Sequence, residues 1–285
     1  MDREGMAAGA GAGEAEFVPY TLVNSQGPAP FVILCDHASN ALPGAYGTLG
    51  LAPEALERHI AWDIGAGEVA RGLAAALDAP AVLSGFSRLL IDPNRGPDDP
   101  TLVMKLSDGA VVPGNRDADA AEVETRRRRY WQPYQDAIGR TVDAKLGAGQ
   151  VPALVSIHSF TPVWRGQPRP WHAGILWDRD PRLPRPLIGR LRQEPGLVVG
   201  DNEPYSGRLC NDTMYRHATA RGLPHALIEI RQDLIDTHSR AAEWAALLAR
   251  VLIEAVAAAG AEVHTVRHYG SYTDGSTTVA GEESS

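Results

Sequence analysis

The sequence predicts a single α/β domain with a mixed, mostly parallel central sheet that is flanked by helices. Three observations indicate this fold. Short apolar runs of strand length recur along the chain, segments with the apolar spacing of amphipathic helices lie between them, and no linker-like change of composition divides the 285 residues. We expect one domain over residues 17–268, a disordered tail over 1–16 and a flexible tail over 269–285, because both ends are rich in small and polar residues.

The predicted strands are short and almost wholly apolar, which is typical of strands buried on both faces of a sheet. They are FVILC (31–35), AVLSGF (81–86), RLLIDP (88–93), ALVSIH (153–158), HAGILW (172–177) and HALIEI (225–230). Helices are predicted at 64–79, over roughly 119–147, within 181–194 and over about 240–259. Strands that alternate with helices favour a mostly parallel sheet that is covered on both faces.

Charge and composition exclude several classes of function. Acidic residues outnumber basic ones, 35 against 27, and a nucleic-acid-binding surface normally needs a basic excess. The arginine run 126–129 falls inside a predicted helix, and we interpret it as a solvated face. No window approaches the roughly 18–20 continuous apolar residues of a membrane span, and the N-terminus lacks the apolar core of a secretory signal.

The cysteine content favours a reducing compartment. Cys35 and Cys210 are the two cysteines of the chain, and two cannot form a disulfide framework. We therefore expect a soluble cytoplasmic protein that binds neither nucleic acid nor membrane. The sequence leaves the oligomeric state open.

Polar clusters follow four of the predicted strands, where DHASN, DPNR, HSF and RQD come after apolar runs. In an open α/β sheet, ligands bind in the crevice outside the carboxyl ends of the strands. We therefore expect one edge of the sheet to collect the polar side chains of these clusters. They are Asp36, His37, Asn94, Arg95, His158, Ser159 and Glu229.

His37 and His158 predict a metal site. Two neutral imidazoles from different strand ends are a usual start for a zinc site, which then needs a carboxylate or another third donor. Asp63 is one candidate for that donor, but a residue just before a helix can equally serve as its N-cap. Asn40 is the alternative, three residues after His37, but an amide is a weak zinc donor. Asp36 is expected to orient a ligating histidine from behind.

Glu229 lies in the middle of the apolar run HALIEI, flanked by isoleucines. A carboxylate buried there has a raised proton affinity unless it is paired. One interpretation is a buried ion pair with Arg231, which lies on the same face of the strand. The other is a general base beside the predicted metal.

Asn94 and Arg95 suit the recognition of an acidic substrate, because an arginine forms a two-pronged contact with a carboxylate. Arg88 could serve the same purpose or could form a surface ion pair. Tyr205 lies in the irregular segment DNEPYSG and could supply a hydroxyl to the site as part of a lid.

Six motifs, in this order along the chain, resemble the N-formylglutamate amidohydrolase family: FVILCDHASN, HIAWDIGA, SRLLIDPNR, SIHSFTP, DNEPYSG and IEIRQDL. The likeness covers roughly residues 17–255. A weaker likeness is to the zinc carboxypeptidases, in whose places HASN, IHS, NR and EIR stand here. Asn40 replaces a glutamate of that wider group, which makes Asp63 the better ligand candidate.

The resemblance implies hydrolysis of a formyl amide on glutamate or a similar small acidic N-acyl amino acid, with a divalent metal, Zn²⁺ being expected. Metal-activated water would attack the amide, with Glu229 as general base, and Arg95 with Asn94 would hold the substrate carboxylate. Two alternatives remain open at this point. One is a non-catalytic carboxylate-binding protein that has lost its metal, and the other is a peptidase-like amidase acting on larger substrates.

Overall fold

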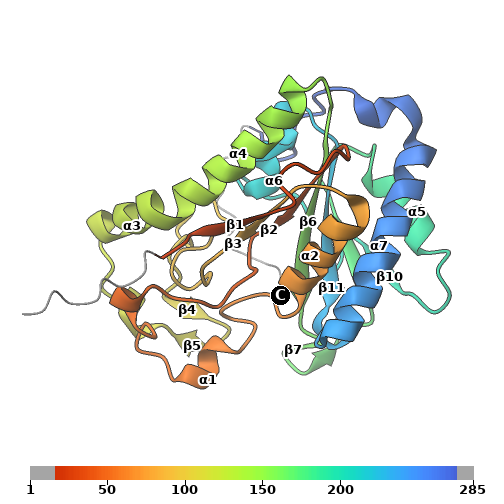
Figure 1. Ribbon diagram of the computed structural model, residues 1–285. Coiled ribbons are helices and arrows are strands. Elements are labelled where there is room, and N and C mark those ends of the chain that lie inside the picture. The colour runs from red at the N-terminus through yellow and green to blue at the C-terminus, as the bar shows by residue number, and fades with distance from the viewer. Residues whose placement is uncertain (1–16, 275–285) are drawn as a thin grey trace, which may run out of the picture.

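A seven-stranded sheet forms the centre of the part of the chain that the computed structural model describes, residues 17–274 (Figure 1). The strand order is β1-β3-β2-β6-β11-β9-β10. The strands are β1 (Tyr20–Val23), β2 (Phe31–Cys35), β3 (Ala81–Ser84), β6 (Ala153–Phe160), β9 (Ala173–Leu176), β10 (Val199–Asp201) and β11 (His225–Arg231). The four central strands, β3, β2, β6 and β11, are parallel, whereas β1 and β9 run antiparallel to their neighbours β3 and β11.

Helices cover both faces of this sheet (Figure 1). On one face lie α2 (Ala66–Leu77), α5 (Pro184–Leu191) and α7 (His238–Ala259). On the other lie α4 (Gln132–Gly147) and α6 (Thr213–His217), and a single π-helical turn joins α4 to α3 (Ala120–Arg126). The predicted single α/β domain with a mixed, mostly parallel sheet is thereby confirmed.

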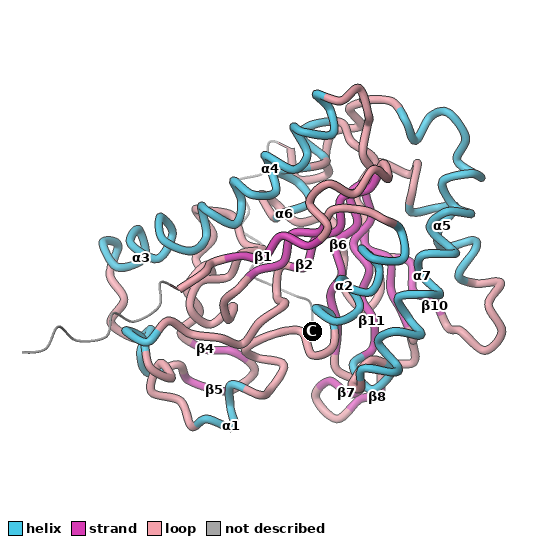
Figure 2. The backbone as a smooth tube through the Cα atoms, in the orientation of Figure 1, coloured by secondary structure: helices cyan, strands magenta, loops and turns pink. Residues whose placement is uncertain are grey.

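Loops rather than helices surround the carboxyl ends of the parallel strands, in the lower part of Figure 2. They carry the short helix α1 (Pro53–Leu56) and two small hairpins, β4 (Leu106–Ser107) with β5 (Ala110–Val111) and β7 (Val163–Trp164) with β8 (Gln167–Pro168). Because loops tolerate irregular backbone and polar side chains, this edge is the place where a site can be built.

The strand predicted over 88–93 is wrong, because this segment forms turns. Leu89, Leu90 and Ile91 are fully buried, so the apolar run reflects packing of a loop inside the core rather than a place in the sheet. The backbone N–H of Leu90 donates to the carbonyl of Ser87 across one of these turns. The edge position next to β3 is taken instead by β1, whose sequence YTLV is half exposed and carried no strand signal.

Residues His238–His264, which include α7, are long and apolar enough to cross a membrane by length and composition. We expected no such segment, because the sequence contains no continuous apolar run of that length. The mean hydropathy of these residues is nevertheless high, although charged residues interrupt the apolar ones. In the fold, one face of α7 is buried against α2 and α5, with Trp244, Leu248 and Leu252 in the core. Ala245 approaches Gly72 of α2 so closely that a Cβ on that glycine would lie 2.8 Å from it. The segment therefore has the pattern of a core helix.

The predicted N-terminal tail, 1–16, lies outside the described residues, and so does 275–285 of the predicted C-terminal tail. The first part of that C-terminal segment is described and contacts the domain. The guanidinium of Arg182 lies over the ring of Tyr269, and the backbone N–H of Tyr272 donates to Asp178. The domain boundaries remain predictions.

Candidate metal centre and substrate cavity

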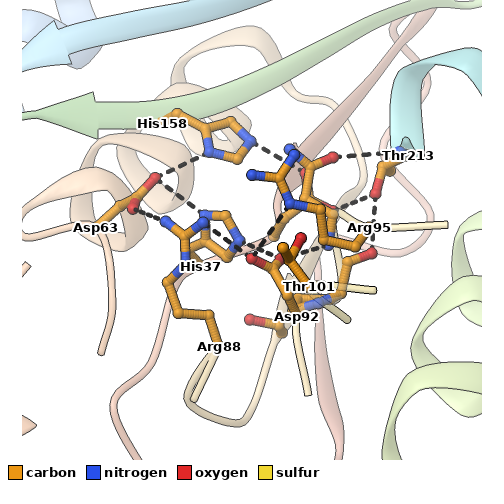
Figure 3. A network of polar contacts seen from close by, with 12 residues as sticks. His37, Asp63, Arg88, Asp92, Arg95, Thr101, His158 and Thr213 are labelled. Atoms are coloured by element: carbon orange, nitrogen blue, oxygen red, sulfur yellow. Dashed lines mark hydrogen bonds and ion pairs between the residues drawn. The ribbon is translucent and has the colours of Figure 1, made fainter. Parts of the chain in front are cut away.

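The two predicted histidine ligands lie side by side at the carboxyl edge of the sheet (Figure 3). His37 follows the end of β2, and His158 is carried by the neighbouring strand β6. Their ring centroids are 5.0 Å apart, and both side chains are buried. Strand order therefore brings together two residues that are far apart in the sequence.

Asp63 turns its carboxylate toward both histidines (Figure 3). Its Oδ2 lies 2.9 Å from Nδ1 of His158 and 3.3 Å from Nδ1 of His37. The helix that follows, α2, begins with Gly65 as its N-cap and has no side-chain cap, so Asp63 is not the cap that the sequence allowed. One donor atom from each of the three residues lies within 4.8 Å of the others, and this buried group could hold a metal ion.

Asn40, the alternative third ligand, does not face this group. Its amide donates to the carbonyl of Leu56 at 3.0 Å and to Oε1 of Glu57 at 3.2 Å. The amide is thus engaged by the segment around α1, and the carboxylate of Asp63 occupies the place next to the histidines.

Each histidine is held from behind by a second carboxylate. Nε2 of His37 lies 2.7 Å from Asp92, and Nε2 of His158 lies 3.1 Å from Asp36. A neutral imidazole has one N–H, and a proton directed at these carboxylates leaves Nδ1 with its lone pair facing Asp63. Two lone pairs and a carboxylate then meet at one point, which is the donor set of a cation site.

The same charges shift the proton affinities of the cluster. Burial opposes a charge on His158, but Asp36 and Asp63 outweigh it and hold the pKa of His158 well above its ordinary value. Burial likewise opposes the charge of Asp63, yet the two histidines lower the pKa of Asp63 below its usual range. The cluster therefore attracts positive charge, whether a proton or a metal ion.

Asp36 is itself fixed by donors from three elements. It accepts hydrogen bonds from Thr213 of α6 at 2.7 Å, from Tyr134 of α4 at 3.0 Å and from Ser156 of β6 at 3.1 Å. The orientation of His158 thus depends on the packing of α4 and α6 on the sheet.

Glu229 of β11 lies beside this group, because it pairs in register with His158 of the neighbouring strand β6. Its Oε2 is buried and has no hydrogen-bond partner among the residues that the structure describes. Burial raises the pKa of Glu229 to about 7, against the opposing charge of His158. The ion pair with Arg231 does not form, because that guanidinium lies 2.7 Å from Asp233 instead.

The two predicted substrate arginines differ in their engagement. Arg88 donates to Asp92 at 2.9 Å and lies 3.6 Å from Asp63, so its guanidinium neutralises carboxylates of the metal group (Figure 3). Arg95 approaches Asp92 only to 4.0 Å, and its Nε has no hydrogen-bond partner among residues 17–274. Asn94 already has a partner, because its Oδ1 accepts a hydrogen bond of 3.2 Å from the backbone N–H of Thr213.

Tyr205 lines the same cavity and is positioned by Arg169, a residue that the sequence analysis did not single out. Arg169 donates to the phenol oxygen at 2.9 Å. Its guanidinium also lies 5.0 Å from the centre of the Tyr205 ring and 5.2 Å from that of Trp164. Burial, with the nearby charge of Glu229, raises the pKa of Tyr205 to about 12, so its hydroxyl keeps its proton.

The predicted residues His37, Asp63, Arg88, Asn94, Arg95, His158, Tyr205 and Glu229 line one cavity of about 220 Å³. This is smaller than a typical drug-sized pocket of roughly 300–1,000 Å³. The structure therefore brings the predicted residues together, with Asn40 left out. Asp92 and Arg169 were missed: Asp92 was visible only as part of the cluster DPNR, and Arg169 lies in an irregular Pro-rich loop without periodicity.

Comparisons with known proteins confirm the resemblance drawn from the motifs. A family model described as N-formylglutamate amidohydrolase matches residues 29–236. The crystal structure of a gene product from Agrobacterium tumefaciens is 35% identical over 84% of this chain and 95% of its own, with a TM-score of 0.80. That of an N-formylglutamate amidohydrolase from Ralstonia eutropha is 26% identical over 85% and 97%, with a TM-score of 0.60. No curated protein matches the chain.

Proposed function

Because this chain belongs to the N-formylglutamate amidohydrolase family of amide-hydrolysing enzymes, we propose that it hydrolyses the amide bond of a small acidic N-acyl amino acid, N-formylglutamate or a related compound. One observation carries the proposal. The buried group His37–Asp63–His158 lies beside a carboxyl of Glu229 that has an unpartnered oxygen, inside one small cavity.

Zn²⁺ is the ion that we propose for this group, because two imidazoles and a carboxylate are a usual donor set for catalytic zinc. When bound, such an ion polarises a carbonyl oxygen and lowers the pKa of water. The protein's own contribution is orientation. Asp36 and Asp92 hold the Nε2 protons of the histidines, so that both Nδ1 atoms face Asp63.

Glu229 acts in this proposal as the general base. It takes a proton from the attacking water as the new C–O bond forms. It then passes that proton to the amide nitrogen, so that the C–N bond breaks and the amine leaves. In the metal-free protein burial raises the pKa of Glu229 to about 7, so this carboxylate has a greater affinity for a proton than an exposed glutamate, as a general base requires. The unpartnered Oε2 is free to make the required hydrogen bonds.

Arg95 is the residue that we propose for the substrate carboxylate, with Asn94 fixing the loop that carries it. Arg88 has another role in this scheme, since it holds Asp63 and Asp92 in place. Arg169 donates to the oxygen of the Tyr205 phenol, which leaves the phenol proton to point at the substrate.

We favour this proposal over the two alternatives that the sequence left open. The reading as a metal-free binding protein started from Asn40, and Asp63 supplies the carboxylate that Asn40 lacks. A peptidase-like amidase needs room for a larger substrate, whereas the cavity is about 220 Å³. For location we propose the cytoplasm, because both cysteines are free thiols.

The test combines metal analysis with an assay of amine release. Protein purified without chelator should contain about one Zn²⁺ per chain and release glutamate from N-formylglutamate or an analogue. Removing the ion should abolish release, and adding Zn²⁺ should restore it. A metal-free protein with full activity would refute the proposed chemistry.

A further inference from the structure

Three leucines line part of the otherwise largely polar cavity, and this part is here called the cavity floor. Leu227 precedes Glu229 by two residues on β11, so both side chains lie on the same face of the sheet. Leu176 of the neighbouring strand β9 pairs in register with Leu227, and this pair lies two residues along β11 from Glu229. Leu209, from the loop between β10 and α6, lines the same space. A substrate whose amide lies at Glu229 therefore places another of its groups against three leucines.

One guanidinium in the cavity is available for a substrate anion. Among the described residues, the arginines that line the cavity are Arg88 and Arg95. Arg88 already neutralises Asp92 and Asp63. Arg169 lies behind Tyr205 and does not line the cavity. This leaves Arg95, and a single arginine fork binds one carboxylate.

His59 does not supply a second positive charge. It lines the cavity, and its Nε2 lies 3.1 Å from Asp108 of the turn between β4 and β5. Burial lowers the pKa of His59 despite that carboxylate, so the ring is neutral near pH 7.

Acidic groups lie beyond the three leucines. A second, smaller hollow shares Leu176, Leu209 and Leu227 with the cavity, and on its other side it is lined by Asp178 and Asp212. Burial raises the pKa of Asp212 to about 7, so this carboxyl is only partly charged near neutral pH, but among the described residues no lysine or arginine lines the hollow to supply a positive charge. A second carboxylate on the substrate would lose its water against the leucines without gaining a counter-charge.

We propose that this enzyme prefers N-acyl amino acids with one carboxylate and an apolar side chain over N-formylglutamate. Arg95 binds the α-carboxylate, and Leu176, Leu209 and Leu227 contact the side chain. This inference rests on the proposed function, because it assumes that the amide is cleaved beside Glu229.

The test compares three N-formyl amino acids of similar length: norleucine, glutamine and glutamate. Glutamine separates shape from charge, because it is neutral and nearly isosteric with glutamate. We expect kcat/KM for amine release to be highest for N-formylnorleucine and at least about tenfold lower for N-formylglutamate, with the glutamine derivative between them. Equal or better turnover of N-formylglutamate would overturn the preference and leave the amidohydrolase function standing.

If none of the three is hydrolysed, the proposed function fails. Because the preference assumes cleavage beside Glu229, it then fails together with the function, whereas hydrolysis of N-formylglutamate as fast as that of N-formylnorleucine overturns the preference alone.

A positive charge placed at the cavity floor should shift the preference toward N-formylglutamate. Leu209 lies in a loop and is partly exposed, so Leu209→Lys is a substitution that the fold can accommodate. The ratio of kcat/KM for N-formylglutamate to that for N-formylnorleucine should rise at least tenfold. Leu22→Lys is the matched control, because Leu22 is 45% exposed on β1, outside the cavity, and its ratio should stay that of the wild type. An unchanged ratio in folded Leu209→Lys protein would overturn the proposal that the cavity floor contacts the substrate side chain.

Discussion

Asp92→Asn tests whether the carboxylates behind the histidines organise the metal group. Asp92 is fully buried and contacts Nε2 of His37 at 2.7 Å, Nη2 of Arg88 at 2.9 Å and the backbone N–H of Asn94 at 2.9 Å. An asparagine keeps the shape and one acceptor oxygen. Its amide nitrogen, however, carries N–H groups that would face the N–H groups of Arg88 or His37, so one hydrogen bond is replaced by a repulsive contact.

Two effects follow, and their sizes can be estimated. Loss of a carboxylate behind a metal-binding histidine typically weakens metal binding roughly 10–100-fold, or about 1.4–2.8 kcal/mol. The guanidinium of Arg88 also loses its nearest counter-charge and keeps only Asp63, at 3.6 Å. Breaking a buried ion pair costs about 3–5 kcal/mol, and because the Arg88 side chain is 21% exposed we expect about 2–3 kcal/mol.

Zinc affinity is measured by competition with a chromophoric chelator, and the free energy of unfolding by urea titration of metal-free protein. Asp143→Asn is the control, since Asp143 makes the same kind of ion pair with Arg221 on the exposed side of α4. It should change neither quantity by more than about 0.5 kcal/mol. Zinc affinity of Asp92→Asn within threefold of the wild type would refute the role assigned to Asp92.

Three further outcomes are expected. Glu229→Gln should lower kcat by about 10²–10⁴-fold with the zinc content unchanged, and more than a tenth of the wild-type kcat would contradict the role of this residue as general base. Because burial raises the pKa of Glu229 to about 7, the metal-free folded protein binds that proton more tightly than the unfolded chain does. This stability is present below about pH 4.5 and is lost as pH rises through 7, on the order of 3 kcal/mol, and a pH-independent difference from Glu229→Gln in urea unfolding would refute it. Arg169→Gln should reduce kcat/KM several-fold in the wild type but have little effect in a Tyr205→Phe background, and additive losses would show that Arg169 does not act through Tyr205.

The candidate site was predictable in part because strand ends are local features. An apolar run that stops at DH or at HS shows where a strand ends, and parallel strands bring such ends to one edge. His37 and His158 were found in this way. Glu229 was found instead as a carboxylate in the middle of an apolar run. The same reasoning was wrong for 88–93, where burial of a loop produced an apolar run that looks like a strand.

Asp63 shows what a linear pattern leaves open. Just before a helix, an aspartate can cap the helix or can turn to a ligand, and both roles have the same sequence. The choice depends on the loop between β2 and α2, where the backbone N–H of Asp63 donates to the carbonyl of His37 at 2.9 Å and brings the carboxylate beside both imidazoles.

The sequence alone established the α/β class, the positions of β2, β3, β6, β9 and β11, and the histidines and glutamate that follow or interrupt these strands, because periodicity and strand ends depend on neighbouring residues. Only the tertiary structure decided which carboxylates stand behind the histidines, that Arg88 is already paired, and that Leu176, Leu209 and Leu227 form the cavity floor. These contacts join segments that are distant in the chain, and their geometry depends on the strand order and on how α4 and α6 pack over the sheet.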